Sequence, residues 1–469
     1  MAGLFPQFSI FPKILGGISG RKSALYKEGG SLGRLYNGRS NPELIPSTNS
    51  FLLMTMKTNT ITNMIPEAPE NLPPMRNHHF SLAALASMPW SLLRALPAIG
   101  VALWTPASAL AQTTYTLTQI SPPPGADYST VESVNNYGRV VGNTKVKAGR
   151  SNIPGPAFVW QNGAAVSLPS LGADRAAQAY SISDSGLIVG HSPSLYVYDP
   201  NSPPKAVWWQ LISGKYQVGD WNTLLPETSR LFLTAATAIS HDGQFVVFDS
   251  KDKDSGLSFP VVAQIGAGGT SMTTWTLNIS PDGSSLYGAG AGAIDYNEGT
   301  GTVRVVGSYA KTATDASHAY LWEMNSLGQT MLDINGNQVG ARFPRGVNGA
   351  GQIIGFFYTA GVYQGHFWDR FDVQSQQLPT LGGGRTIPTS INVDGLVTGS
   401  SSRSGRNALD HAFLWDISGG LRDLNALKPT DTSGIELTKG QQINDAGQIL
   451  AFGLRKGIGY NVLLRPVSP

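Results

Sequence analysis

The sequence contains no cysteine among its 469 residues. This absence excludes a disulfide framework and a thiolate metal centre, so burial and hydrogen bonding must hold the fold together. Charged residues are also few, at 13%, whereas glycine and proline occur 55 and 30 times. A chain that is poor in charge and rich in turn-forming residues is typical of a repeat architecture with many turns.

Excess positive charge is confined to the first part of the chain. Residues 1–111 hold nine Lys or Arg against four Asp or Glu, a net charge of +5, while residues 112–469 carry −2. A nucleic-acid-binding domain is expected to carry its basic residues on the folded part. The composition therefore predicts no nucleic-acid partner.

A secretory signal is predicted from Met75 to Ala111. This segment has a positive start, an apolar run (ALPAIGVALW) and small residues at Ala109 and Ala111, which is the pattern of a signal peptide. The apolar run is too short to cross a bilayer as a helix. We therefore expect cleavage after Ala111 and no transmembrane anchor in the mature chain.

The residues before this signal, 1–74, show no sustained helical or strand periodicity. Since a signal peptide acts at the start of a chain, we expect translation to begin at Met75 and residues 1–74 to be a mis-assigned start or disordered. The alternative is a longer, unusual targeting leader. Residues 112–469 then form one domain, exported to the periplasm, the cell surface or the medium.

A short segment recurs seven times downstream of the signal: a small residue, Ile or Val, Ser or Asn, a turn with Gly, and an apolar strand. The matches begin at Ser133 (SVNNYGRVVG), Ser181 (SISDSGLIVG), Ala238 (AISHDGQFVV), Asn278 (NISPDGSSLYG), Gly346 (GVNGAGQIIG), Ser390 (SINVDGLVTG) and Gln442 (QINDAGQILA). Their turn glycines are separated by 48, 57, 40, 68, 44 and 52 residues. Loop insertions between otherwise similar units would explain the irregular spacing.

Each match has the chemistry of a β-hairpin, in which Asn or Asp accepts local backbone hydrogen bonds and Gly supplies a positive φ. The turn carboxylates are Asp184, Asp242, Asp282, Asp394 and Asp445. A carboxylate that holds its own turn is not available for proton transfer. We therefore interpret these residues as structural rather than as acid–base catalysts.

Further strands follow each hairpin. Five of them end in Trp: PAFVW at Trp160, KAVWW at Trp209, HAYLW at Trp322, QGHFW at Trp368 and HAFLW at Trp415. A last element follows, such as SLPSLG from Ser167, QLPTLGG from Gln377 and LRDLNAL from Leu421. Each unit is thus predicted to be a four-stranded antiparallel sheet.

Repeated four-stranded units predict an all-β protein, a β-propeller of seven blades in which each sheet covers the next. The last unit lacks an outer strand, while TYTLTQI (residues 114–120) is a strand without a unit. We expect these two strands to pair and close the ring. A pair of packed sheets or a solenoid is the alternative, and it gives TYTLTQI no role.

The strings HAFLWDISGGLRDLNAL (from His411), QLPTLGGG (from Gln377) and QINDAGQIL (from Gln442) resemble the His-Ala-Phe, or HAF, repeat family of predicted extracellular bacterial proteins. The resemblance spans roughly residues 130–467 and is strongest in the last three units. It implies export and a repeat fold, and it brings no activity, cofactor or catalytic residue. Only His318 and His411 occupy the position of the first letter of the family name.

No cofactor is predicted, because the sequence has no GxSxG, HExxH or phosphate-binding motif. Two histidines at the repeated position are too few for a metal centre, so His318 and His411 are interpreted as packing or hydrogen-bonding residues. A weak calcium candidate is DSKDKDSG, with its three carboxylates. It contains Asp249, Asp252 and Asp254, but its spacing fits no standard calcium loop and it has no late bidentate Glu, so a solvated loop is the favoured interpretation.

Function is expected on the face that carries the connections between second and third strands, such as NTKVKAGRSNIPG, HSPSLYVYDPNSPP and SSSRSGRNALD, which are long and polar. Arginine recurs in the links between units, at Arg175, Arg230, Arg345 and Arg385. If these residues surround one end of the ring, they could bind an acidic polymer. Solvated or Asp-paired surface arginine is the alternative.

The sequence thus favours a monomeric, non-catalytic, exported propeller that binds a glycan or a protein. The competing class is an extracellular polysaccharide hydrolase or lyase. Such an enzyme needs paired carboxylates, or an acid with a Tyr or His, that converge on one site. Two unpaired carboxyl groups that face each other near the axis would favour the enzyme, and carboxylates bound in turns would favour the binding protein.

Overall fold

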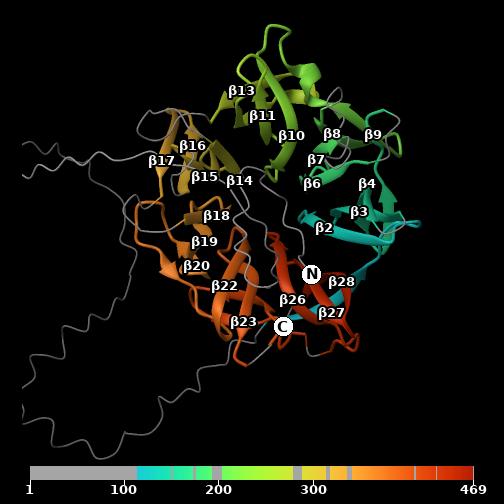
Figure 1. Cartoon of the computed structure of the whole chain (residues 1–469), viewed down its shortest axis with the longest axis vertical. Helices are drawn as coiled ribbons and strands as arrows, with labels where there is room; N and C mark the ends of the chain where they lie inside the picture. Colours follow the sequence, from blue (N-terminus) through green and yellow to red (C-terminus); the bar gives the residue numbers. More distant parts are fainter. Residues whose placement is uncertain are drawn as a thin grey trace, which may run out of the picture. The chain divides into compact units, whose positions relative to one another are not determined.

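The computed structural model describes residues 113–148, 151–172, 176–192, 203–277, 288–312, 317–334, 341–405, 408–428 and 430–467. The strands of this part of the chain form seven four-stranded antiparallel sheets, arranged as blades around a common axis (Figure 1). The predicted seven-bladed β-propeller is therefore confirmed. The predicted leader (residues 1–111), Arg175 and Asp282 lie outside the described residues.

Blade 1 consists of β2 (Tyr128–Val134), β3 (Val140–Ala148), β4 (Ser151–Gln161) and β5 (Ala164–Ser167). Blade 2 consists of β6 (Gln178–Ile182), β7 (Ile188–Ser192), β8 (Lys205–Ile212) and β9 (Lys215–Asp220). Blade 3 consists of β10 (Leu231–Ile239), β11 (Phe245–Asp252), β12 (Ser258–Ile265) and β13 (Met272–Thr276). Blade 4 consists of β14 (Gly288–Asn297), β15 (Thr302–Ala310), β16 (His318–Asn325) and β17 (Gly328–Asp333). Blade 5 consists of β18 (Ala341–Val347), β19 (Ile353–Thr359), β20 (Val362–Trp368) and β21 (Gln376–Gln377). Blade 6 consists of β22 (Gly382–Ile391), β23 (Val397–Arg403), β24 (His411–Asp416) and β25 (Gly420–Asp423). Blade 7 consists of β26 (Glu436–Ile443), β27 (Ile449–Arg455), β28 (Ile458–Val467) and β1 (Thr114–Ile120).

Blade 7 contains both ends of the described chain. Its strand order is β1-β28-β27-β26, and β1 pairs antiparallel with β28 from Thr114 opposite Val467 to Ile120 opposite Asn461. The predicted closure by residues 114–120 is confirmed. The first strand therefore supplies the outer strand that the last unit lacks.

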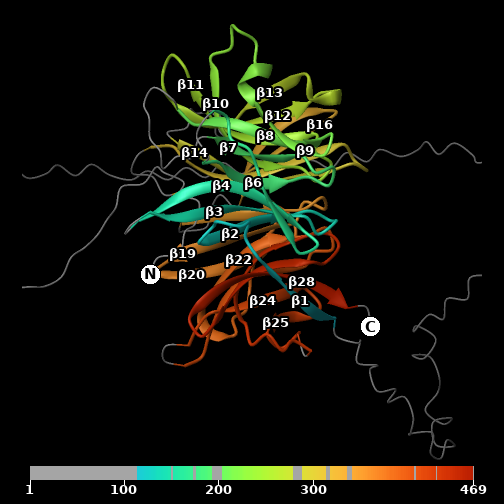
Figure 2. The ribbon, with the colours of Figure 1, turned by 90° about the vertical axis from the view of Figure 1, so that its right-hand side faces the viewer.

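The blades present two different ends. The first strand of each blade lies nearest the axis in Figure 1, and the strands run roughly along that axis in the side view of Figure 2. In an antiparallel blade, the first-to-second and third-to-fourth turns share one end, which we call the turn face. The second-to-third connections and the links between blades share the other end, which we call the loop face.

The third strands supply much of the core between blades. Their terminal Trp side chains are at most 3% exposed: Trp160, Trp209, Trp322, Trp368 and Trp415. Between blades 5 and 6, for example, the ring centroids of Phe367 and Trp415 lie 5.0 Å apart. Each sheet is thus covered by its neighbour, as the repeat pattern predicts.

A β-bulge interrupts the innermost strand of every blade. The bulged residues are Glu132, Tyr180, Thr237, Gly292, Arg345, Thr389 and Gln441. On the second strand beside the bulge, a Cβ added at Gly190 would lie 1.9 Å from the backbone oxygen of Gln178, and one at Gly399 would lie 2.1 Å from that of Ile387. Glycine at the end of the repeated apolar strand therefore permits the close strand approach that accompanies the bulge.

Two features of the predicted repeat are corrected. The match at Asn278 falls largely outside the described residues, and the inner hairpin of blade 4 is instead β14–β15, which turns between Asn297 and Thr302. This turn (NEGTG) lacks the Asp-Gly pattern of the others. The segment NTKVKAGRSNIPG is also not a long loop, because β3 continues to Ala148 and β4 starts at Ser151.

An Asp-x-Asn sequence joins blade 2 to blade 3 and blade 6 to blade 7. On the link after blade 6, Asn425 donates to the backbone oxygen of Leu437 at 2.9 Å and accepts from its N–H at 2.8 Å. Asn222 makes the same pair of bonds with Leu233 after blade 2, at 3.0 and 2.8 Å. The motif is therefore a docking point for the innermost strand of the following blade.

Candidate functional site on the turn face

An Asn that precedes the turn in blades 5, 6, 7 and 1 holds neighbouring blades together. The side-chain amide of Asn348 donates to the backbone oxygen of Asn392 at 2.9 Å, and Asn392 donates to that of Asn444 at 3.1 Å. The series continues from Asn444 to Asn135 at 2.7 Å, and from Asn135 to Ser183 at 3.0 Å. One line of hydrogen bonds thus crosses blades 5, 6, 7, 1 and 2.

The next residue of the turn makes a second inter-blade series, in which a backbone N–H of one blade donates to a side-chain oxygen of the following blade. The carboxylate of Asp445 accepts from the N–H of Val393 at 2.9 Å, and Asn136 Oδ1 accepts from the N–H of Asp445 at 2.8 Å. Asp184 in turn accepts from the N–H of Asn136 at 2.8 Å. The prediction that Asp184 and Asp445 serve their own turns is therefore corrected, because they bind the preceding blade.

His241 occupies the same turn position in blade 3. Its Nε2 lies 4.0 Å from a carboxylate oxygen of Asp295 in blade 4 and 3.8 Å from one of Asp445 in blade 7. Asn136 of blade 1 also approaches Asp445, at 3.3 Å. Blades 3 and 7 are not neighbours, so these side chains meet at the axis. We call His241, Asp295, Asp445, Asn136 and Asp184 the axial cluster.

Asp295 is the most perturbed acid of the axial cluster. Burial raises its pKa to about 6, and the nearby Asp445 acts in the same direction, while His241 opposes the shift. A carboxyl group that titrates near neutrality can exchange a proton under physiological conditions. Asp295 is therefore the residue of this face with the clearest potential for acid–base chemistry.

Asp295→Asn is expected to raise the free energy of unfolding at pH 7 by about 1 to 3 kcal/mol. The folded-state pKa of about 6 lies above the ordinary value, so the charged form costs stability above pH 6 and the cost disappears below pH 4. Denaturant titrations at pH 4 and pH 7 measure the difference. The exposed Asp394 is the control, since Asp394→Asn should shift neither value by more than about 0.5 kcal/mol. Lower stability of Asp295→Asn at pH 7 would contradict this assignment.

Further charges lie inside the ring on the innermost strands. Burial raises the pKa of Glu132 despite hydrogen bonds from Thr130 and Asn143. Burial lowers the pKa of Lys439, with Glu132 acting in the opposite sense and Arg345 in the same sense. These three charged residues come from blades 1, 7 and 5, so the interior near the axis is polar as well.

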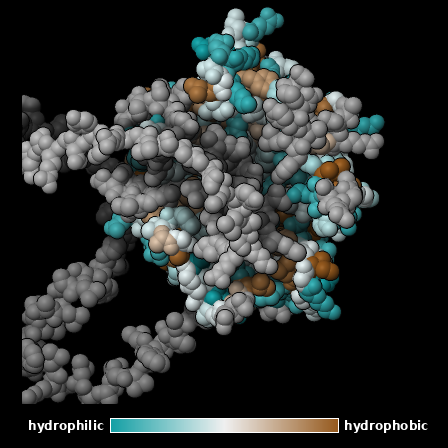
Figure 3. Space-filling view, in the orientation of Figure 1, coloured by the Kyte–Doolittle hydropathy of each residue, from teal (hydrophilic) through white to brown (hydrophobic). Residues whose placement is uncertain are grey.

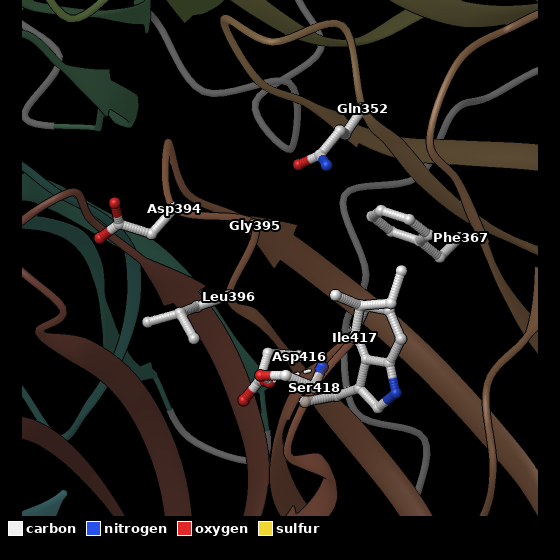
Figure 4. A pocket seen from close by; sticks show the side chains of 9 residues that line it. Gln352, Phe367, Asp394, Gly395, Leu396, Asp416, Ile417 and Ser418 are labelled. Atoms are coloured by element: carbon white, nitrogen blue, oxygen red, sulfur yellow. Dashed lines mark hydrogen bonds between the residues drawn. The ribbon is translucent and has the colours of Figure 1, made fainter. Parts of the chain in front are cut away.

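Two clefts open on the turn face, one on either side of blade 6. The cleft between blades 5 and 6 has a volume of about 320 Å³ and is lined by Gln352, Phe367 and Leu396, among others (Figure 4). The cleft between blades 6 and 7 has a volume of about 400 Å³ and reaches Asp445 of the axial cluster. Asp394 lines both clefts.

The three predicted arginines among the described residues, Arg230, Arg345 and Arg385, have different partners. Arg230 pairs with Asp252 and Asp254 at 3.1 and 2.8 Å, in the blade whose outer end is mainly hydrophilic in Figure 3. Arg385 lies in β22, rather than in a link, and pairs with Asp410.

Arg345 likewise lies in β18 and not in a link. Its guanidinium carbon stands 5.2 Å from the ring centroid of Phe356, and burial lowers its pKa. The described arginines thus differ in their surroundings, and a clamp for an acidic polymer stays a prediction.

The carboxylates of the calcium candidate, DSKDKDSG, have different surroundings. Asp252 accepts hydrogen bonds from the N–H groups of Asp254 and Ser255 at 3.0 and 2.7 Å, while Asp249 lies within β11, where burial raises its pKa to about 6. No three His, Asp or Glu of the described residues form a group that could hold a metal ion.

The two histidines of the repeated position are bound differently. His318 stacks on Tyr309 with ring centroids 5.0 Å apart. His411 is buried between Asp423 and Glu436, each 2.6 Å from one of its ring nitrogens. In blade 2 the same position holds Lys205, which pairs with Asp220 at 3.0 Å, so blades 2 and 6 each place a side-chain nitrogen beside the Asp of the fourth strand.

The axial cluster and the clefts are not predicted by the sequence pattern. His241 stands one residue before a turn Asp, at a variable position of the repeated segment, and Asp295 precedes the atypical turn of blade 4. A useful signal is the variable residue directly after Ser or Asn in the turn, because this position supplies Asn136, Asp184, His241 and Asp445 of the axial cluster. The described residues also include no helix long and apolar enough to span a membrane.

No protein-family model matches the sequence, and no curated protein matches it significantly. Among solved structures, the chain is similar to the β-propeller domain of the Trilobed protease from Pyrococcus furiosus, with 10% identity, a TM-score of 0.44, and coverage of 73% of this chain and 98% of that one. It is also similar to TolB from Acinetobacter baumannii, with 11% identity, a TM-score of 0.34, and coverage of 70% and 80%. A third similar structure is the GH74 xyloglucanase from Xanthomonas campestris, with 14% identity, a TM-score of 0.42, and coverage of 73% of this chain and 54% of that one. These similarities concern the fold alone.

Proposed function

We propose that this chain is an exported, non-catalytic binding protein of the HAF-repeat type, which binds a glycan or a protein on its turn face. The predicted signal peptide supports export. The inter-blade hydrogen bonds of the turns support a rigid scaffold, and rigid scaffolds that carry polar surface groups are common binding sites.

The observation that carries this proposal is the bonding of three turn carboxylates, Asp184, Asp242 and Asp445. Asp184 and Asp445 both accept backbone N–H groups of the preceding blade, and Asp242 accepts the N–H of Gln244 at 3.0 Å. Groups held in this way orient a surface but are poorly placed to transfer protons. The turn face therefore has more of the character of a binding surface than of a catalytic centre.

A screen of the full chain against immobilised polysaccharides and proteins, read for both retention and product release, tests the proposal. We expect retention of at least one ligand without release of products. Retention of none would contradict the binding function, and release of sugars would contradict its non-catalytic character.

A polysaccharide hydrolase is the second candidate, because Asp295 combines a raised pKa with the proximity of His241 and Asp445. In that case Asp295 would act as general acid. Asp295→Asn separates the two functions: it should abolish product release by an enzyme, whereas a binding protein should keep its retention.

A further inference from the structure

We propose that the turn face binds a basic peptide segment, whose Lys or Arg side chains enter the two clefts beside blade 6. The inference rests on the proposed binding function and names the chemistry of the partner.

The first argument is the shape of the two clefts. They flank the turn that carries Asp394, and each is lined in part by apolar side chains that are accessible: Leu396 and Ile417 in one, Leu396 and Pro466 in the other. A carboxylate beside accessible apolar side chains suits a ligand side chain with an apolar stem and a cationic head. Lys and Arg have this construction.

The second argument is charge. The carboxylate of Asp394 is exposed and makes no hydrogen bond or ion pair among the described residues, whereas Asp416 is neutralised by Arg422. Asp445 adds a second carboxylate to the cleft between blades 6 and 7. The clefts therefore have an excess of negative charge, which attracts a cationic partner and repels an acidic one.

The third argument favours a peptide over a small cation. Ile417 lines the cleft between blades 5 and 6 and is 71% exposed, and Val393 beside Asp394 is 54% exposed. Exposed apolar side chains next to charged clefts are typical of protein-binding surfaces. A peptide with alternating basic and apolar residues could contact both kinds of group.

The test measures the binding of two labelled hexapeptides, Lys-Leu-Lys-Leu-Lys-Leu and Glu-Leu-Glu-Leu-Glu-Leu, to the full chain by fluorescence anisotropy at low salt. We expect the basic peptide to bind at least tenfold more tightly than the acidic one. Since charge attraction contributes, the affinity should fall as salt increases.

Two variants locate the binding. Asp394→Asn removes the shared carboxylate, and Ala446→Phe narrows the cleft between blades 6 and 7 without a change in charge. Each should weaken binding of the basic peptide at least fivefold. Asp254→Asn is the matched control, because it removes an exposed carboxylate of the loop face and should leave the affinity unchanged.

Equal affinity of both variants and the wild type would overturn the proposal, and so would preference for the acidic peptide. Oligomers of glucosamine serve as a competing cationic probe. If they bind in an Asp394-dependent manner while the basic peptide does not, the partner is an amino sugar and the peptide proposal is wrong. Glycan retention without any binding of the basic peptide would refute this inference alone, whereas no retention in any screen would refute the proposed function as well.

Discussion

Deletion of β1 (residues 114–120) is expected to lower the free energy of unfolding by about 5 kcal/mol or more, or to prevent folding altogether. The deletion breaks the complete ladder with β28 and removes Tyr115 and Ile120, which are each 2% exposed. It also leaves β28 with an unpaired edge, which favours aggregation.

Thermal unfolding followed by circular dichroism, together with the soluble yield, measures this effect. Thr116→Ala is the control, because Thr116 lies in the same strand and is exposed, and its change should cost no more than about 0.5 kcal/mol. If the shortened chain unfolds at the temperature of the wild type, β1 does not close the ring.

Gly399→Ala is expected to cost at least about 3 kcal/mol of stability. A Cβ at this position would lie 2.1 Å from the backbone oxygen of Ile387 and 2.8 Å from the ring of Phe413. Because a backbone oxygen cannot rotate away as a side chain can, the two inner strands of blade 6 would have to separate.

Gly384→Ala is the matched control in the same blade, since a Cβ there has no neighbour within 4 Å. Urea denaturation should place this control within about 0.5 kcal/mol of the wild type. Equal loss of stability in both variants would show that the close approach at Gly399 is not the cause.

The sequence predicts this fold well because the repeat pattern is local. The Gly of the turns and the Trp of five third strands are recognised from a few adjacent residues, and TYTLTQI is assigned by counting strands. The predicted position of the inner hairpin of blade 4 is wrong, because its turn, NEGTG, lacks the repeated pattern. The segment NISPDG near Asn278 has that pattern and therefore predicts the hairpin there.

The site is less predictable because it depends on residues from different blades. The sequence identifies Asp184 and Asp445 as turn residues, but it does not show that they bind the preceding blade or that His241 approaches Asp445 from the opposite side of the ring. The clefts beside blade 6 are likewise formed between blades. Such contacts follow from the ring geometry and have no counterpart in local sequence.

The arginines of the loop face also show that local sequence does not reveal the partners of a side chain. The recurrence of arginine suggested a common site, yet Arg230 and Arg385 are each paired with Asp residues of their own blades. Local charge partners, such as Asp252 and Asp410, decide whether a surface arginine is available to a ligand.

Hydrogen–deuterium exchange of the full chain, with and without the ligand that the screen retains, tests the location of the binding face most directly. We predict that the ligand protects the turns at residues 133–139, 390–397 and 443–448, all on the turn face. Protection confined to the loop face, such as the connection at residues 253–257, would contradict the account.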